Sequence, residues 1–158
     1  MWPRYNFALK VALWQLKIIL MKTDSSIKNI ALASINRSAM DVHEWGKTRI
    51  DPTWFPITVE IQPDELTIVF TFFSDTDWTL ITTKKIIGMI SGQLNEMPFS
   101  EVDDFMLGDF KNLKIEKTIF RITNMYGERA DFIMEPGKAS MGIIKAIQTI
   151  QGLYKSSE

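Results

Sequence analysis

Histidine chemistry is the first possibility that the sequence raises, and it is confined to one place. His43 is the only histidine of the chain, and Asp41 and Glu44 flank it in the segment DVHEW. An imidazole next to carboxylates can serve as a general base. No serine stands in a nucleophile-elbow context, and the chain has no cysteine. One histidine with carboxylates as the other ligands would also be an uncommon zinc site. We therefore predict that the protein is not an enzyme, with no catalytic residue, no metal and no cofactor.

Aromatic residues raise a second possibility, a cleft for a small ligand. Trp45, Trp54 and Phe55 follow His43 closely in the sequence. These four side chains could line a cleft that binds a small molecule or holds an active site. In the alternative, Trp54 and Phe55 only anchor a linker against the core, because aromatic rings pack efficiently. We expect the anchoring role and keep the cleft as a ligand-binding hypothesis.

The charge pattern argues against polyanionic ligands. The chain has 18 Lys and Arg against 19 Asp and Glu, so no bulk attraction to nucleic acid is expected. A phosphoinositide needs several converging cations, but the turns QPDE (62–65) and SDTD (74–77) carry carboxylates, and Lys84 and Lys85 suit a solvated turn. We predict no nucleic-acid partner, and the sequence disfavours phosphoinositide recognition.

The N-terminal residues 5–21 have the apolar spacing of a helix with one broad hydrophobic side. Lys10 and Lys17 interrupt the stretch, so it predicts neither a signal peptide nor the ~20 apolar residues that cross a bilayer. Its apolar side needs a partner, which could be the rest of the chain, a second copy or a membrane surface. We expect packing within the chain or in a homo-oligomer ahead of weak membrane contact. The residues expected at this contact are Trp2, Leu9, Leu13, Trp14, Leu16 and Leu20.

The rest of the chain divides into a helical part and a strand-rich part. A weaker helical pattern covers residues 26–42, after the N-cap residues TDSS (23–26). Glycine and prolines between 43 and 56 mark a boundary, so we predict a helical N-terminal arm at 1–52 and a β domain at 53–158. Within the β domain, β-branched and aromatic residues predict strands at 57–61, 66–73, 78–90 (with an internal turn), 94–99, 102–107, 114–124 and 129–135.

The C-terminal residues 138–154 give the clearest helical pattern. Isoleucines recur on one face, at positions 143, 144, 147 and 150, followed by Tyr154. Such a helix would cover the open end of an antiparallel sheet. The predicted fold class is therefore mainly β (α+β): an antiparallel barrel or sandwich of about seven strands, capped by a C-terminal α-helix and preceded by a helical arm.

The β domain also resembles the bacterial pleckstrin-homology-like domains, which are similar to GRAM modules. The resemblance rests on LITTKKII (80–87), MPFSEVDDF (97–105), FRITNMYGERADFIM (120–134) and the closing helix, and it covers residues 57–155. It implies a seven-stranded, partly open barrel that serves as a scaffold for binding rather than for catalysis. It does not explain the N-terminal arm.

Taken together, these features predict a non-enzymatic interaction module in the cytoplasm. Its expected partner is another protein or a second copy of the chain, bound with the help of the arm. Two alternatives stay open. One is a peripheral protein whose N-terminal helix lies on the inner face of the membrane, and the other is a small-molecule binder or enzyme with a tryptophan-lined cleft.

Overall fold

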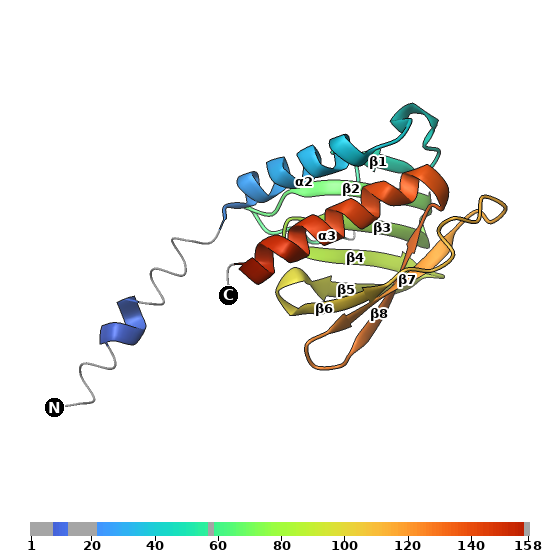
Figure 1. Cartoon of the computed structure of the whole chain (residues 1–158). Helices are drawn as coiled ribbons and strands as arrows, with labels where there is room; N and C mark the ends of the chain where they lie inside the picture. The colour runs from blue at the N-terminus through green and yellow to red at the C-terminus, as the bar shows by residue number, and fades with distance from the viewer. Residues whose placement is uncertain (1–7, 13–21, 57–58, 157–158) are drawn as a thin grey trace.

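The computed structural model describes residues 8–12, 22–56 and 59–156. Within them, eight strands form two antiparallel sheets, and two long helices lie side by side across one of the sheets (Figure 1). The helices are α2 (Asp24–Ser38) and α3 (Ser140–Ser156), and the short 3₁₀ turns are η1 (Val42–Glu44), η2 (Phe99–Glu101) and η3 (Gly137–Ala139). The strands are β1 (Thr48–Ile50), β2 (Thr67–Ser74), β3 (Asp77–Thr82), β4 (Lys85–Ile90), β5 (Gln93–Pro98), β6 (Val102–Met106), β7 (Thr118–Asn124) and β8 (Arg129–Met134).

The strands follow each other as two meanders. Sheet A has the order β1-β2-β3-β4-β5 and sheet B the order β6-β7-β8. Ser91 and Gly92 join β4 to β5 with φ of 49° and 82°, which is the left-handed backbone that a tight hairpin turn requires. The predicted hairpin between β7 and β8 is confirmed, with Gly127 at φ 81°. The described chain is therefore an open antiparallel sandwich of the α+β class with a C-terminal helix.

One side of sheet A, the inner face, is covered by sheet B, α3 and α2. It carries Val69, Ile81 and Ile86, which pack against both sheets and helices in one hydrophobic core. The isoleucine stripe predicted on the C-terminal helix is confirmed. All four isoleucines of that stripe are buried, and Tyr154 is partly buried against the same core. Two helices and a second sheet therefore cover the inner face.

The opposite side of sheet A, the outer face, has a separate core. Phe70, Trp78, Leu80 and Ile87 are buried there under residues of the connector 51–66 that joins β1 to β2. Sequence reasoning predicted a strand at 57–61, but the described residues 59–61 are not in a strand. Val59 and Ile61 instead pack on the outer face. An extended segment that buries every second side chain has the same alternation of apolar and polar residues as a strand, which explains the wrong prediction.

The helix α2 and the strand β1 belong to this packed unit. Thr23 caps α2, as the sequence predicts, by accepting a hydrogen bond from the Ser26 amide at 3.2 Å. Three apolar side chains of α2 are buried in the inner core, and β1 pairs with β2. The Thr149 hydroxyl on α3 donates to the Ser34 hydroxyl on α2 at 2.9 Å. The sequence boundary at residue 52 thus falls between two neighbouring strands of sheet A.

The predicted N-terminal contact residues lie mostly outside the described residues, namely Trp2, Leu13, Trp14, Leu16 and Leu20. Residues 8–12 are helical and exposed, and Leu9 is 59% exposed. No helix within the described residues is long and apolar enough to cross a membrane. Self-association and membrane contact through this segment therefore stay predictions.

Candidate ligand-binding pocket beside β1

An open pocket of about 530 Å³ lies on the outer face of sheet A, beside β1. Sites that hold small ligands usually measure ~300–1,000 Å³. Three segments line this one: residues 46, 47, 49 and 50 at and before β1, residues 51–54 at the start of the connector, and the β2 residues Phe70 and Phe72. We call it the β1 pocket, and its size makes it the leading candidate for a binding site.

Aromatic rings form the apolar part of the β1 pocket. The ring centroid of Trp54 lies 5.3 Å from that of Phe72 and 5.9 Å from that of Phe70. Phe70 in turn contacts Trp78, whose ring is fully buried in the outer core and whose Nε1 has no partner within the described residues. Trp54 is 56% exposed. It is thus held by ring contacts to the core and still offers an apolar surface to a ligand.

Two cations add charge to the pocket. Arg49 pairs with Phe70 in the strand register, and the Phe72 amide donates to the Lys47 carbonyl at 2.9 Å. Residues directly opposite on paired strands share a face, so both basic side chains leave β1 on the side of the rings. Neither has a carboxylate partner within the described residues, whereas Asp51 pairs with Lys28 at 2.6 Å. The pocket therefore carries two positive charges that no carboxylate neutralises.

Glu135, directly after β8, holds the strand that carries these cations. Its carboxylate accepts hydrogen bonds from the amides of Gly46 and Lys47 and from the Thr48 hydroxyl, each at 2.9 Å. The Thr48 hydroxyl also lies 2.9 Å from the Thr71 hydroxyl on β2. Sheet B thus fixes the start of β1 and, through it, one wall of the β1 pocket.

The four side chains of the predicted cleft do not come together. Trp54 lines the β1 pocket, and Phe55 packs partly buried against the outer core, which is the anchoring role. Trp45 lies in the inner core, only 5% exposed, where its ring packs so close to Gly142 that an added Cβ would lie 3.0 Å away. His43 is exposed in η1. The cleft hypothesis in its original form is therefore wrong, because sheet A separates Trp45 from Trp54.

The side chains around His43 form an exposed ion-pair cluster. The metal-binding atoms of Asp41, His43 and Glu44 lie within 4.8 Å of one another. Lys138 pairs with Asp41 and, at 3.2 Å, with Glu44. Its hydrogen bond and charge lower the pKa of Asp41, and the same two carboxylates raise the pKa of Lys138. Lys138 is therefore already paired with two of the three side chains of this cluster.

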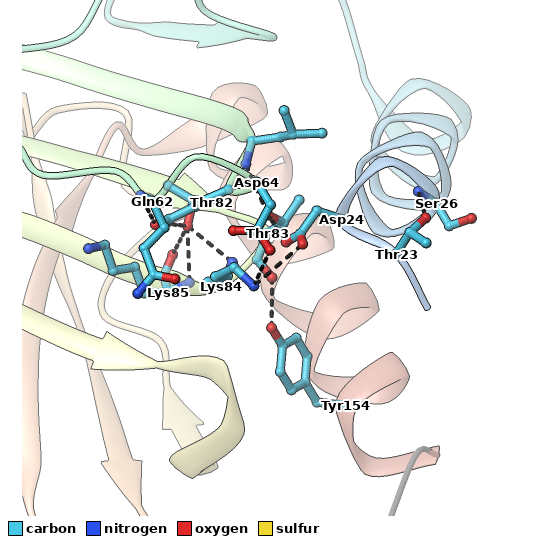
Figure 2. A network of polar contacts seen from close by, with 12 residues as sticks. Thr23, Asp24, Ser26, Gln62, Asp64, Thr82, Thr83, Lys84, Lys85 and Tyr154 are labelled. Carbon is cyan, nitrogen blue, oxygen red and sulfur yellow. Dashed lines mark hydrogen bonds and ion pairs between the residues drawn. The ribbon is translucent and has the colours of Figure 1, made fainter. Parts of the chain in front are cut away.

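A second polar cluster surrounds the turn between β3 and β4 (Figure 2). Lys84 pairs at 3.4 Å with Asp24 of α2 and with Asp64 of the connector. The Thr83 hydroxyl donates to Asp24 at 2.5 Å, and the Tyr154 hydroxyl donates to the Thr83 carbonyl at 2.9 Å. Burial works against the charged form of Lys84, but the two carboxylates outweigh it and raise its pKa. The cluster ties the turn to α2, the connector and α3.

The lysines of this turn are not free for a ligand. Lys85 pairs with Glu96 at 3.2 Å and donates to the Glu60 carbonyl at 2.9 Å. Beside it, the buried Glu65 carboxylate accepts hydrogen bonds from the Thr82 hydroxyl and, at 3.1 Å, from the backbone amide of Gln62. The expectation of solvated turn lysines was therefore wrong, since both lysines are engaged in ion pairs. With carboxylates bound to them, they form no site for a phosphorylated ring.

Of the residues that line the β1 pocket, sequence reasoning singled out Trp54 and missed the others, among them Lys47, Arg49, Phe70 and Phe72. The alternation of Phe70 and Phe72 with Thr71 was visible and indicates two rings on one side of a strand. The partner strand β1 gave no such signal because it has only three residues. Comparison with protein-family models, with curated proteins and with solved structures found no match. The function is therefore argued from the pocket itself.

Proposed function

We propose that the protein is a non-enzymatic binding module of the pleckstrin-homology-like type. The order of its elements supports this proposal. A four-stranded meander, β2–β5, is followed by a three-stranded meander, β6–β8, and then by α3. The resemblance also implies seven strands and a closing helix, so this order supports the proposal, with β1 and α2 as additions. The module would act in the cytoplasm.

The observation that carries the binding role is the β1 pocket. Its charged lining consists of Lys47, Arg49 and Asp51, and the carboxylate of Asp51 is already bound by Lys28. Such a set can hold a ligand by charge and by ring contacts. Its carboxylate and its hydroxyl, those of Asp51 and Thr53, are not hydrogen-bonded to each other within the described residues, as a general base and a nucleophile would be. The arrangement therefore suits binding rather than catalysis.

The test uses 8-anilinonaphthalene-1-sulfonate, an anionic aromatic dye that fluoresces when its rings leave water. We expect the full-length protein to bind the dye, and Trp54→Ala to lose most of the fluorescence gain because it removes the exposed ring of the β1 pocket. The matched control is Leu94→Ala on β5, since Leu94 is also about half exposed, at 51%, but does not line the pocket. Equal fluorescence from both variants, with unchanged circular dichroism, would contradict the proposed site.

A second candidate function is self-association through the N-terminal residues. The observation that favours it is the exposed apolar surface on residues 8–12, where Leu9 is 59% and Val11 38% exposed. Sedimentation equilibrium of the full chain should show an oligomer that Leu9→Gln weakens. Met106→Gln, at a site 65% exposed on β6, is the control. A monomeric mass at all concentrations would reject this function.

The same surface could instead lie on a membrane. Flotation with vesicles that contain anionic lipid separates the two ideas. A peripheral membrane protein would float with the vesicles, and Leu9→Gln would reduce the floating fraction. Protein that stays at the bottom of the gradient would remove the membrane alternative.

A further inference from the structure

We propose that the β1 pocket recognises a flat aromatic ring that carries a carboxylate, and that Arg49 binds the carboxylate. This inference rests on the proposed function, because it names the ligand class of the same pocket. Three features carry it: the hydrogen bonds of the Arg49 guanidinium, the unbalanced charge of the lining, and the aromatic rings of the lining, among which Trp54 is exposed.

The Arg49 guanidinium is held through one of its three nitrogens. Its Nη1 donates to the carbonyls of Trp45 at 3.2 Å and of Thr48 at 2.9 Å. Its Nε and Nη2 have no partner within the described residues. These two nitrogens form one edge of the planar fork, and such an edge matches the two oxygens of a carboxylate. Because the side chain is already fixed at Nη1, it loses less freedom when the other edge binds a ligand.

The local charge favours an anion over a cation. Lys47 precedes Arg49 by two residues on the same side of β1 and, like Arg49, has no carboxylate partner within the described residues. The acidic residue of the lining, Asp51, is neutralised by Lys28 at 2.6 Å. A ligand carboxylate would compensate the two free cations, whereas a cationic ligand would be repelled by them.

The aromatic lining selects a flat apolar group next to the anion. Trp54 stands edge-on to Phe72, with an interplanar angle of 86°, and tilted at 59° to Phe70. Rings arranged in this way leave room for a further ring in an offset or edge-to-face contact. The volume of about 530 Å³ is large enough for a two-ring system with its carboxylate. The ligand could be a free acid or the C-terminal aromatic residue of a peptide, which present the same chemistry.

Isothermal titration calorimetry of the full chain with 2-naphthoate and its neutral amide, 2-naphthamide, tests the inference. We expect the acid to bind about tenfold or more tightly at low salt, the gain that a charge-assisted hydrogen-bonded pair gives. Arg49→Gln should reduce acid binding to the level of the amide without changing amide binding. The affinity of Arg49→Lys for the acid should fall between those of the wild type and of Arg49→Gln, since lysine keeps the charge but lacks the planar guanidinium that binds both carboxylate oxygens. Arg37→Gln, at an exposed arginine outside the pocket, is the control and should change nothing.

The outcomes separate this inference from the proposed function. Equal affinity for the acid and the amide would overturn the carboxylate assignment and leave the pocket as a binding site. Tight binding of 2-naphthyl phosphate without binding of 2-naphthoate would also overturn it, in favour of a phosphate ligand. Failure of all three compounds to bind the folded wild-type chain would overturn the inference and the proposed site together. A tetrapeptide that ends in Trp with a free carboxylate, compared with its C-terminal amide, distinguishes a peptide from a free acid.

Discussion

The two faces of sheet A are both covered, but by different kinds of structure. On the inner face, α3, α2 and sheet B bury the sheet side chains in one continuous core. On the outer face, the connector 51–66 contributes a few side chains, such as Phe55 and Val59, to a smaller core. The inner face keeps a polar pocket of about 350 Å³ beside β5, whereas the outer face keeps the larger β1 pocket at the edge of its cover.

The difference follows from how the covering elements satisfy their own backbones. A helix or a sheet satisfies its backbone hydrogen bonds internally. It can therefore pack against another sheet without water between them and bury a whole row of side chains. An irregular connector must keep much of its backbone in contact with water, so it covers only part of a face. An exposed ring such as Trp54 and unpaired cations such as Arg49 can persist at such a place. The pocket under the irregular cover therefore combines aromatic rings with cations that have no carboxylate partner within the described residues. In the pocket beside the regular cover, by contrast, Arg121 is paired with Asp131.

The largest expected effect is the loss of stability when a buried side chain of the inner core is truncated. Ile147 on α3 is fully buried, so Ile147→Ala should lower the free energy of unfolding by about 2–5 kcal/mol through lost burial and a cavity. The same substitution on the outer face, Ile61→Ala, removes a half-buried side chain and should cost less than about 1.5 kcal/mol. Urea unfolding followed by circular dichroism measures both. Similar losses for the two variants would break the distinction between the faces.

The next effect concerns Glu135, which holds the start of β1 and so one wall of the β1 pocket. Glu135→Ala removes three hydrogen bonds to a charged carboxylate, those of the Gly46 and Lys47 amides and of the Thr48 hydroxyl. We expect a loss of about 1.5–3 kcal/mol in unfolding free energy and weaker binding of 8-anilinonaphthalene-1-sulfonate, because β1 shifts. Glu128→Ala removes an exposed glutamate whose side chain makes no hydrogen bond within the described residues, and it should change neither quantity. Unchanged dye binding in a destabilised Glu135→Ala would show that this anchor does not shape the pocket.

The sequence predicts the inner face better than the outer one, for a physical reason. The isoleucines of α3 recur with the helical period and are buried as that pattern requires. The period of two in Val59 and Ile61 indicates a strand, yet these residues pack on the outer face without pairing in the sheet. Periodicity reports which side chains are buried on one side, and it does not report whether the backbone is hydrogen-bonded to a neighbour.

The candidate site was predictable only in part. Trp54 was singled out because it lies close to His43 and Trp45 in the sequence, but the sequence gives no reason to place Trp45 on the inner face and Trp54 on the outer one. That separation depends on the pairing of β1 with β2, which comes from contacts between Thr48 and Thr71 and between Arg49 and Phe70. Residues so far apart in sequence are brought together by tertiary structure, which local patterns do not encode.

A smaller effect is expected where the C-terminal end of α3 contacts the turn between β3 and β4. Tyr154→Phe removes the hydrogen bond to the Thr83 carbonyl and should lower the unfolding free energy by about 1 kcal/mol. Burial raises the pKa of Tyr154, so the folded state holds its proton more tightly. Its contribution is therefore complete below the unfolded pKa of about 10 and is lost as the pH rises through the folded pKa. In Tyr154→Phe this alkaline loss should be reduced, whereas Tyr126→Phe, at a tyrosine 70% exposed, should keep it.

The smallest effect belongs to a contact between Asp77, at the start of β3 in sheet A, and Lys117, directly before β7 of sheet B. Asp77 accepts hydrogen bonds from the Ser91 amide at 2.8 Å and from Lys117 at 3.0 Å, and these lower its pKa. A lowered pKa gives stability that is present above the unfolded pKa of about 3.9 and is lost as the pH falls through the folded pKa. Asp77→Asn should therefore flatten the acid limb of the stability curve.

The size of this effect is limited because Lys117 is partly exposed, so we expect less than about 1 kcal/mol at neutral pH. Asp75→Asn removes a neighbouring exposed carboxylate that has no ion pair in the part of the chain that the structure describes, and it serves as the control. If Asp77→Asn also weakened dye binding at the β1 pocket, the two sheets would be coupled through this contact. The pocket would then depend on the whole sandwich, and not only on the connector and β1.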